Sequence, residues 1–376
     1  MRRSCCTAVL AAVALMALSG CSTDQVTLDP NPDKPFVLGG VSELTEIAQL
    51  TGPGAINDTE SVMVAGTDLG SMVNVGDRTL FLFGDTFGER DPDSTGGQGD
   101  MWRSNTGAWT TDDDPADGIE FDGWVDDALG IAAPLIEGDH QGNDAGGEVT
   151  KIPTYGFTVG SNIYVSYMSV KHWGAAGDWD ANYAALIVSH DDGETWEQVE
   201  GVQWPGDSDF VQFAAAQVSD GARDWVYLWT IPAGRFGNVH LMRVPATPES
   251  VESQAAYEYF AGTDDGDPMW STELSEAAPV VEGTIGELSV VWSSYLERWL
   301  MTYSDGGDAI IREGVTPWGP WGDPLVLVPG DQYDGLYSPY MNPRYVDDDG
   351  RRIYFTLSLW GPYNVFWFSA ELDRIE

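Results

Sequence analysis

Hydrophobic and polar positions along this chain follow short strand-like runs and not helical spacing. From residue 37 onward, runs of aromatic and β-branched residues are separated by clusters of Gly, Asp and Pro, and no long amphipathic helix is indicated. Five segments share one form: a strand that contains scattered polar residues, then a short turn, then a strand rich in aromatic residues. The second strands begin at Thr79, Asn162, Trp225, Arg298 and Arg352. This weak internal repeat predicts an all-β fold.

The spacing of the repeat favours a five-bladed β-propeller. Each segment is followed by a further strand or two, so one repeat holds the three or four strands of a blade. A β-sandwich of similar strand count is the alternative. Residues 189–196, SHDDGETW, support the propeller because they resemble the Asp-box turn of sialidase-type blades. There the aspartate, here Asp191, caps a hairpin and the tryptophan, here Trp196, packs between strands, so the motif is interpreted as structural.

The first 36 residues have a different pattern. Two arginines precede an apolar stretch over residues 8–18, which is too short and wrongly flanked to span a membrane. The ending Leu-Ser-Gly-Cys resembles a bacterial lipobox, which implies cleavage before Cys21 and lipidation of its thiol; an ordinary signal peptide is the alternative. We therefore expect a lipoprotein signal peptide over 1–20, the lipidated Cys21 with a flexible tether over 21–36, and a propeller domain over 37–376.

Charge and cysteine content limit the kinds of partner, disulfide and metal site that the chain is expected to have. The formal net charge is −43 and the acidic residues are spread along the chain, which argues against nucleic acid and against docking on anionic lipid, and favours a neutral polymer or a cation. All three cysteines lie within the first 21 residues, so neither disulfides nor thiolate metal sites are expected in the domain. No cofactor is expected, with a structural calcium ion left open, and the acidic runs 112–118 and 347–350 are interpreted as solvated turns.

The stretch GTDLGSMVNVGDRTLFLFGDTFG, residues 66–88, carries the candidate chemistry. It reads as a hairpin, and a two-residue turn at 76–77 places Asp68 opposite Asp85. Asp is a poor strand residue, and like charges in direct opposition destabilise a sheet, so this pair calls for a functional reason. A bulge at Gly66 or Gly70 would shift the pairing.

Two carboxylates at the mouth of a propeller channel suit a glycosidase. Burial and mutual repulsion drive their pKa values apart, so that one donates a proton and the other accepts one. A separation of about 6.5–9.5 Å leaves room for water and gives inversion, whereas about 5–5.5 Å gives a covalent intermediate. Nearby phenylalanines favour Asp85 as the acid, and flanking glycines favour Asp68 as the base. The alternative is that each aspartate caps a turn or bonds to backbone amides.

Polar and aromatic residues elsewhere in the repeat are candidate sugar ligands. Trp173, Trp318 and Trp321 are candidates for stacking on sugar rings. For each residue taken alone, a core or turn position is the alternative. The candidate substrate-binding residues are Glu148, Lys151, Gln212, Glu287, Tyr340, Asn342, Tyr363 and Asn364.

One ordered set of motifs resembles a known family. It consists of GTDLG with FGDTFG, then RWLMTYS…IIREGVTPWGPW (298–321), then LYSPYMNPRY…YFTLSLWGPYNVFWF (337–368). Over roughly residues 40–372 the chain resembles the domain of unknown function family 4185, also classed as glycoside hydrolase family 183. The resemblance implies a five-bladed propeller that acts as an inverting endo-D-arabinanase on mycobacterial-type arabinogalactan and lipoarabinomannan. The matching aspartates are Asp68 and Asp85.

These observations lead to competing hypotheses. The first is an actinobacterial enzyme, monomeric and held by the Cys21 lipid on the outer face of the cytoplasmic membrane, that cleaves α-D-arabinofuranosyl linkages of envelope arabinan. The second is a non-catalytic carbohydrate-binding propeller with the same anchor, although a lectin has no need of the Asp68–Asp85 pair. A sialidase is a third, but it requires an arginine trio that the expected channel strands lack.

Overall fold

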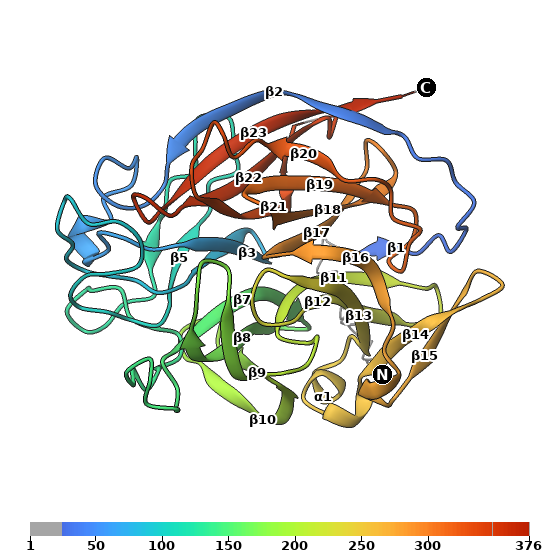
Figure 1. The fold of residues 1–376 in the computed structure, drawn as a ribbon, viewed down its shortest axis with the longest axis horizontal. Helices are drawn as coiled ribbons and strands as arrows, with labels where there is room; N and C mark the ends of the chain where they lie inside the picture. The colour runs from blue at the N-terminus through green and yellow to red at the C-terminus, as the bar shows by residue number, and fades with distance from the viewer. Residues whose placement is uncertain (1–24, 348, 376) are drawn as a thin grey trace, which may run out of the picture.

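The structure is a computed structural model that describes residues 25–347 and 349–375. The expected signal peptide and Cys21 therefore lie outside the described residues. Strands dominate this part of the chain, which confirms the all-β prediction (Figure 1). The helical elements are the α-helix α1 (Pro248–Val251) and three 3-10 helices, Glu60–Val62, Gln254–Ala256 and Leu274–Glu276. None of the helices in the described ranges has the length and apolar character needed to cross a membrane.

Four sheets are regular four-stranded antiparallel blades. The first contains β3 (Leu69–Val75), β4 (Arg78–Phe83), β5 (Thr106–Thr110) and β6 (Gly123–Trp124). The second contains β7 (Thr150–Val159), β8 (Asn162–Trp173), β9 (Trp179–Ser189) and β10 (Glu197–Pro205). The third contains β17 (Leu288–Ser293), β18 (Arg298–Asp305), β19 (Asp308–Gly314) and β20 (Leu325–Val328). The fourth contains β21 (Leu336–Val346), β22 (Arg352–Leu359), β23 (Asn364–Arg374) and, at its outer edge, β2 (Leu38–Gln49).

The remaining strands form a seven-stranded sheet. Its order is β1 (Val26–Thr27), β11 (Gln212–Ser219), β12 (Asp224–Ile231), β13 (Gly237–Pro245), β14 (Glu258–Asp264) and β15 (Asp267–Ser271), and β16 (Pro279–Ile285) also pairs with β13. The prediction of five blades is therefore met in part: four regular blades form, and the remaining repeat lies in this larger sheet. Strand β1, from the stretch expected to be a tether, pairs in parallel with the end of β11.

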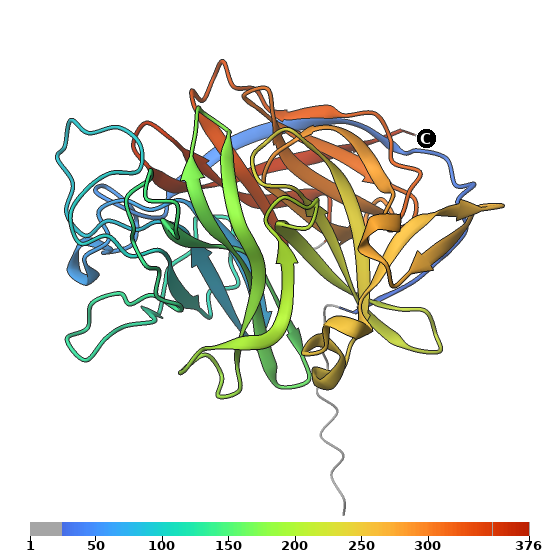
Figure 2. The same cartoon turned by 60° about the horizontal axis from the view of Figure 1, so that its bottom comes forward.

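The strands β3, β7, β11, β17 and β21 contact one another in a closed ring, as expected for the inner strands of a propeller. Each is the first strand of one predicted segment, and the predicted aromatic-rich second strands form β4, β8, β12, β18 and β22. Strand β2 pairs antiparallel with β23, so segments from both ends of the domain share one blade and close the ring (Figures 1 and 2).

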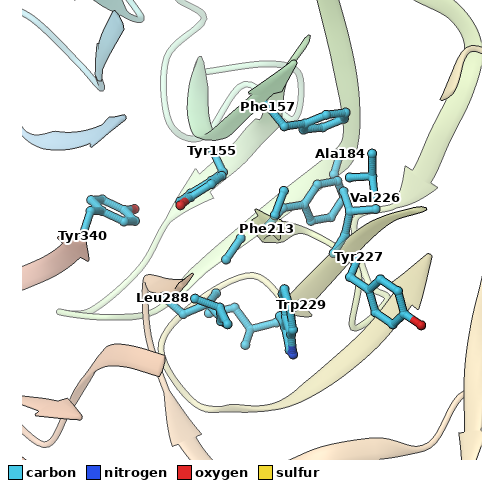
Figure 3. Close-up of a cluster of buried hydrophobic side chains, with 14 of the residues drawn as sticks. Tyr155, Phe157, Ala184, Phe213, Val226, Tyr227, Trp229, Leu288 and Tyr340 are labelled. Carbon is cyan, nitrogen blue, oxygen red and sulfur yellow. The ribbon is translucent and has the colours of Figure 1, made fainter. Parts of the chain in front are cut away.

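Two buried tyrosines on non-adjacent inner strands, Tyr155 and Tyr340, meet across the ring with their ring centroids 6.5 Å apart, and we call this pair the plug. Each inner strand contributes at least one buried side chain to a single core cluster. Examples, one from each strand and each at most 4% exposed, are Met72, Tyr155, Phe213, Leu288 and Tyr340. Figure 3 shows Tyr155 on β7 and Tyr340 on β21 with their hydroxyl ends toward each other, and Phe213 and Leu288 beside them. Aromatic and aliphatic groups of this size bury a large apolar area, so this cluster stabilises the packing of the blades against one another.

The Asp-box has the structural role predicted for it. The Asp191 carboxylate accepts hydrogen bonds from the Thr195 amide at 2.9 Å and the Thr195 hydroxyl at 2.6 Å. The Ser189 hydroxyl donates to the same carboxylate and accepts from the Gly193 amide at 2.8 Å. Trp196 is partly buried against a core cluster. The motif therefore closes the turn that follows β9.

Candidate active site

The hairpin that carries the two aspartates follows the predicted register for most of its length. Pairing holds from the turn at 76–77 to Ser71. It changes at Gly70, whose φ of 90° lies in the region that favours glycine, and Leu69 then pairs with Phe83. The extra residue makes a β-bulge, a feature that bends a strand and redirects its side chains.

The bulge moves the two carboxylates out of direct opposition. The Gly84 amide donates to the carbonyl of Asp68 at 3.1 Å, so Asp68 lies opposite Gly84 and Asp85 is one residue further along. The predicted Asp68–Asp85 facing pair is therefore wrong by one residue. A Cβ added to Gly84 would lie only 2.3 Å from Asp68 Oδ1, so the glycine provides the space for this carboxylate. The charges still interact, because Asp85 raises the pKa of Asp68.

A buried set of threonine hydroxyls fixes the segments around both aspartates. The Thr86 hydroxyl donates to the Gly84 carbonyl at 2.8 Å, and lies 2.7 Å from the Thr67 hydroxyl and 3.0 Å from that of Thr106. All three threonines are buried. Buried hydrogen bonds of this kind hold neighbouring residues in one geometry, which a pair of reacting groups requires.

Asp85 lies just after β4 and is 9% exposed. Its Oδ1 accepts hydrogen bonds from Trp102 Nε1 at 2.7 Å and from the Thr150 hydroxyl at 2.6 Å. Burial raises the pKa of Asp85 to about 7, and the hydrogen bonds from Thr150 and Trp102 oppose that rise. An indole N–H can only donate, so Trp102 directs a proton at Asp85 and favours its ionised form.

Asp68 lies just before β3 and is half-buried. Its Oδ2 accepts a hydrogen bond from the Tyr337 hydroxyl at 3.0 Å, whereas its Oδ1 is buried and has no hydrogen-bond partner among the described residues. Burial, followed by the charge of Asp85, raises the pKa of Asp68 to about 7, while the hydroxyls of Tyr337 and Tyr363 lower it. A buried oxygen without a partner is costly, and it marks a position that a ligand or a proton would satisfy.

The two pKa values do not separate in the way expected from the sequence. We expected glycines to leave Asp68 better solvated than Asp85, but burial raises both carboxyls to about 7. Two carboxyls in this range can exchange protons with a substrate near neutral pH, one as an acid and one as a base.

An ion pair lies beside Asp68. Arg235 Nη2 is 2.6 Å from Glu287 Oε1, and Arg235 Nε contacts both carboxylate oxygens at 2.9 and 3.0 Å. The guanidinium carbon of Arg235 lies 4.7 Å from the centroid of the Tyr337 ring. Gln212 donates to the carbonyls of Pro232 and Gly234, both at 2.8 Å, and so holds the β12–β13 turn that carries Arg235.

The structure brings three of the predicted substrate ligands to this site. Tyr363 lies in the turn between β22 and β23 and lowers the pKa of Asp68. Glu287 is bound to Arg235, and Tyr340 belongs to the plug, where the charges of Glu287 and Asp68 raise its pKa.

The other predicted ligands bond within the protein. Glu148 forms an ion pair with Lys151 at 3.2 Å and accepts from the Ser169 hydroxyl at 2.6 Å. Asn342 accepts from the Asn74 side chain at 3.0 Å, near the opposite end of β3 from Asp68. Gln212 acts on a turn, as described above. Asn364 accepts from the Thr51 hydroxyl and donates to the Pro362 carbonyl.

The three tryptophans proposed to stack on sugars also contact protein. Trp173 packs against Trp179 with ring centroids 5.6 Å apart, Trp318 is 7% exposed, and a Cβ on Gly314 would lie 2.7 Å from the Trp321 ring. Sequence reasoning missed Trp102, Thr150, Tyr337 and Arg235. Thr150 and Tyr337 stand at the starts of inner strands, where the Asp68–Asp85 argument already placed the site. In the described residues, no group of three or more His, Cys, Asp or Glu could hold a metal ion.

Comparisons with known proteins agree with this architecture. A candidate hydrolase from Bacteroides ovatus has a similar structure, with 14% identity, a TM-score of 0.54, and coverage of 82% of this chain and 86% of that chain. A GH43_1 enzyme from Xanthomonas citri has a lower TM-score of 0.47, with 10% identity and coverage of 88% of this chain and 90% of that chain. An α-L-arabinofuranosidase from Clostridium thermocellum has a TM-score of 0.43, with 14% identity and coverage of 78% of this chain and 82% of that chain.

At this identity the likeness to the Bacteroides ovatus hydrolase shows a shared fold alone. No curated protein matches the sequence. The family model described as "Domain of unknown function (DUF4185)" matches residues 54–369, which include both aspartates and every inner strand. The chain therefore belongs to the DUF4185 family.

Proposed function

We propose that this protein is a glycoside hydrolase in which Asp68 and Asp85 are the acid and base. The observation that carries the proposal is the pair of carboxyls at one end of the ring, both with pKa raised to about 7, one of which has a buried, unpartnered oxygen. A merely structural aspartate is normally satisfied by hydrogen bonds that lower its pKa, as Asp191 is.

The hydrogen bonds favour roles opposite to those expected from the sequence. Trp102 and Thr150 both donate to Asp85, which suits a carboxylate that serves as base. Asp68, whose Oδ1 is unpartnered, suits a protonated acid. In this mechanism Asp85 removes a proton from water as the water oxygen bonds to the anomeric carbon. The glycosidic C–O bond breaks, Asp68 protonates the leaving oxygen, and the anomeric configuration inverts.

The substrate class rests on the family resemblance. We propose endo-cleavage of α-D-arabinofuranosyl linkages in mycobacterial-type arabinogalactan and lipoarabinomannan. We further propose a monomer whose seven-stranded sheet serves as the fifth blade, anchored through the Cys21 lipid at the outer face of the cytoplasmic membrane, close to the envelope polymer. No cofactor is part of this mechanism, and the membrane contact is the lipid alone.

The test is incubation of the chain from residue 22 onward with mycobacterial arabinogalactan, with released oligosaccharides read by chromatography. Asp68→Asn and Asp85→Asn are run in parallel, with Asp77→Asn, in the exposed turn of the same hairpin, as the matched control. Arabino-oligosaccharides from wild type and control, and none from either site variant, would support the proposal. Arabinan binding without release would instead identify a carbohydrate-binding propeller. Product formation by both site variants would refute the assigned pair.

A further inference from the structure

We propose that Arg235 and Glu287 are positioning residues, a charge-balanced pair that holds Tyr337 against Asp68 and sets the pH range in which that carboxyl changes its charge. The inference rests on the proposed function only for its effect on catalysis, since the protonation of Asp68 can be measured without turnover.

The pair has the geometry of a strong, directed interaction. Three contacts of 2.6–3.0 Å join the guanidinium and carboxylate in a fork arrangement. The Glu287 side chain is only 6% exposed, and that of Arg235 is 28% exposed. Burial would lower the pKa of Arg235, but the charge and hydrogen bonds of Glu287 raise it. The two opposite charges therefore compensate each other in a position where an unpaired charge would be costly.

The pair reaches Asp68 through Tyr337. The Arg235 guanidinium carbon lies 4.7 Å from the centre of the Tyr337 ring, a cation–π distance, and the Tyr337 hydroxyl donates to Asp68 Oδ2 at 3.0 Å. The three side chains come from different parts of the ring: Arg235 from the β12–β13 turn, Glu287 from the residue before β17, and Tyr337 from β21. One ion pair thus fixes the tyrosine that contacts the reacting carboxyl.

The pair also balances charge around Asp68. Glu287 raises the pKa of Asp68, and the charge of Asp68 in turn raises the pKa of Arg235. Removing one partner would leave a buried charge of known sign beside Asp68. The titratable groups that act on Asp68 are Asp85 after β4, Tyr337 and Tyr340 on β21, Tyr363 in the β22–β23 turn, Glu287 and Arg235.

The sign of the effect separates this role from a structural one. With Arg235→Gln, the unpaired Glu287 carboxylate disfavours the charge of Asp68, so the pKa of Asp68 should rise by about one pH unit. With Glu287→Gln, the unpaired guanidinium favours that charge, so the pKa should fall by a similar amount. The double variant should return close to the wild-type value. A purely structural pair would give losses of stability without opposite shifts.

The experiment is a ¹³C NMR titration of the aspartate carboxyls, with the Asp68 signal assigned through Asp68→Asn. The matched control is the ion pair between Arg243 and Glu258, which are 2.7 Å apart and both lie in the seven-stranded sheet; Arg243 also stacks on Trp225 and Trp270. Replacing Arg243 or Glu258 by Gln should leave the titration of Asp68 unchanged. The limb of the kcat/KM–pH profile that belongs to Asp68 should move with the NMR value.

Opposite shifts of Asp68 that cancel in the double variant would support the proposal, even if no hydrolysis were detected on any glycan. Shifts in the same direction, or changes no larger than those of the Arg243 and Glu258 variants, would overturn it. Because Glu287→Gln and the double variant leave no unpaired carboxylate, they keep the test decisive should Arg235→Gln fail to fold.

Discussion

Asp85 should make the folded protein less stable at alkaline pH, and its replacement by Asn should remove that cost. Burial raises the pKa of Asp85 from 3.8 to about 7 in the folded state, so folding favours the protonated carboxyl. The stabilisation is fully present below pH about 4 and is lost as the pH rises through about 7. A difference of this size corresponds to about 4 kcal/mol, an upper limit because Asp85 interacts with Asp68.

Asn retains an oxygen that can accept from Trp102 and Thr150, and it does not titrate. The free energy of unfolding of Asp85→Asn minus that of wild type should therefore increase by about 3–4 kcal/mol between pH 4 and pH 8, so the variant becomes relatively more stable as the pH rises. Urea unfolding followed by tryptophan fluorescence at both pH values measures this difference. Asp77→Asn, exposed in the same hairpin, should show no such change. A variant that is equally destabilised at pH 4 and pH 8 would refute the reasoning.

Three further outcomes follow from the geometry. Gly84→Ala should lower kcat about 100-fold, because the new Cβ would lie 2.3 Å from Asp68 Oδ1. Gly123→Ala, where a Cβ would meet no atom within 4 Å, should leave kcat unchanged, and equal losses in the two variants would contradict the prediction. Trp102→Phe removes a hydrogen bond that lowers the pKa of its acceptor, so the limb of the pH–rate profile set by that carboxyl should move up by about one pH unit, and a downward shift would refute the assignment. Asp191→Ala should lower the melting temperature without altering kcat/KM, and a specific loss of activity would make the Asp-box more than structural.

The fold could be predicted further than the site. The aromatic-rich second strands and the register from the turn at 76–77 to Ser71 depend on local pattern, and both are confirmed. The Gly70 bulge could not be placed, because a glycine in a strand permits a bulge without requiring one. The seven-stranded sheet likewise depends on β16, which pairs with β13 although the β14–β15 hairpin lies between them in the sequence.

The candidate ligands show a second limit. Asp68 and Asp85 were selected because their positions break a strand rule, and the structure brings both to the candidate site. Gln212 and Asn364 follow the pattern expected of sugar ligands, polar residues at strand starts, yet their side chains bond to the backbone and to Thr51. Sequence alone does not distinguish a polar group that meets a substrate from one that satisfies a turn. Arg235 was missed because a turn residue shows no periodicity.

The plug has a consequence for how a polymer can reach the carboxyls. Tyr155 and Tyr340 meet across the ring, so under the proposed function a glycan would reach the carboxyls from one end of the ring and not by passing through it. It would arrive and depart on that one side. An interior linkage would then not need to be reached from a free chain end.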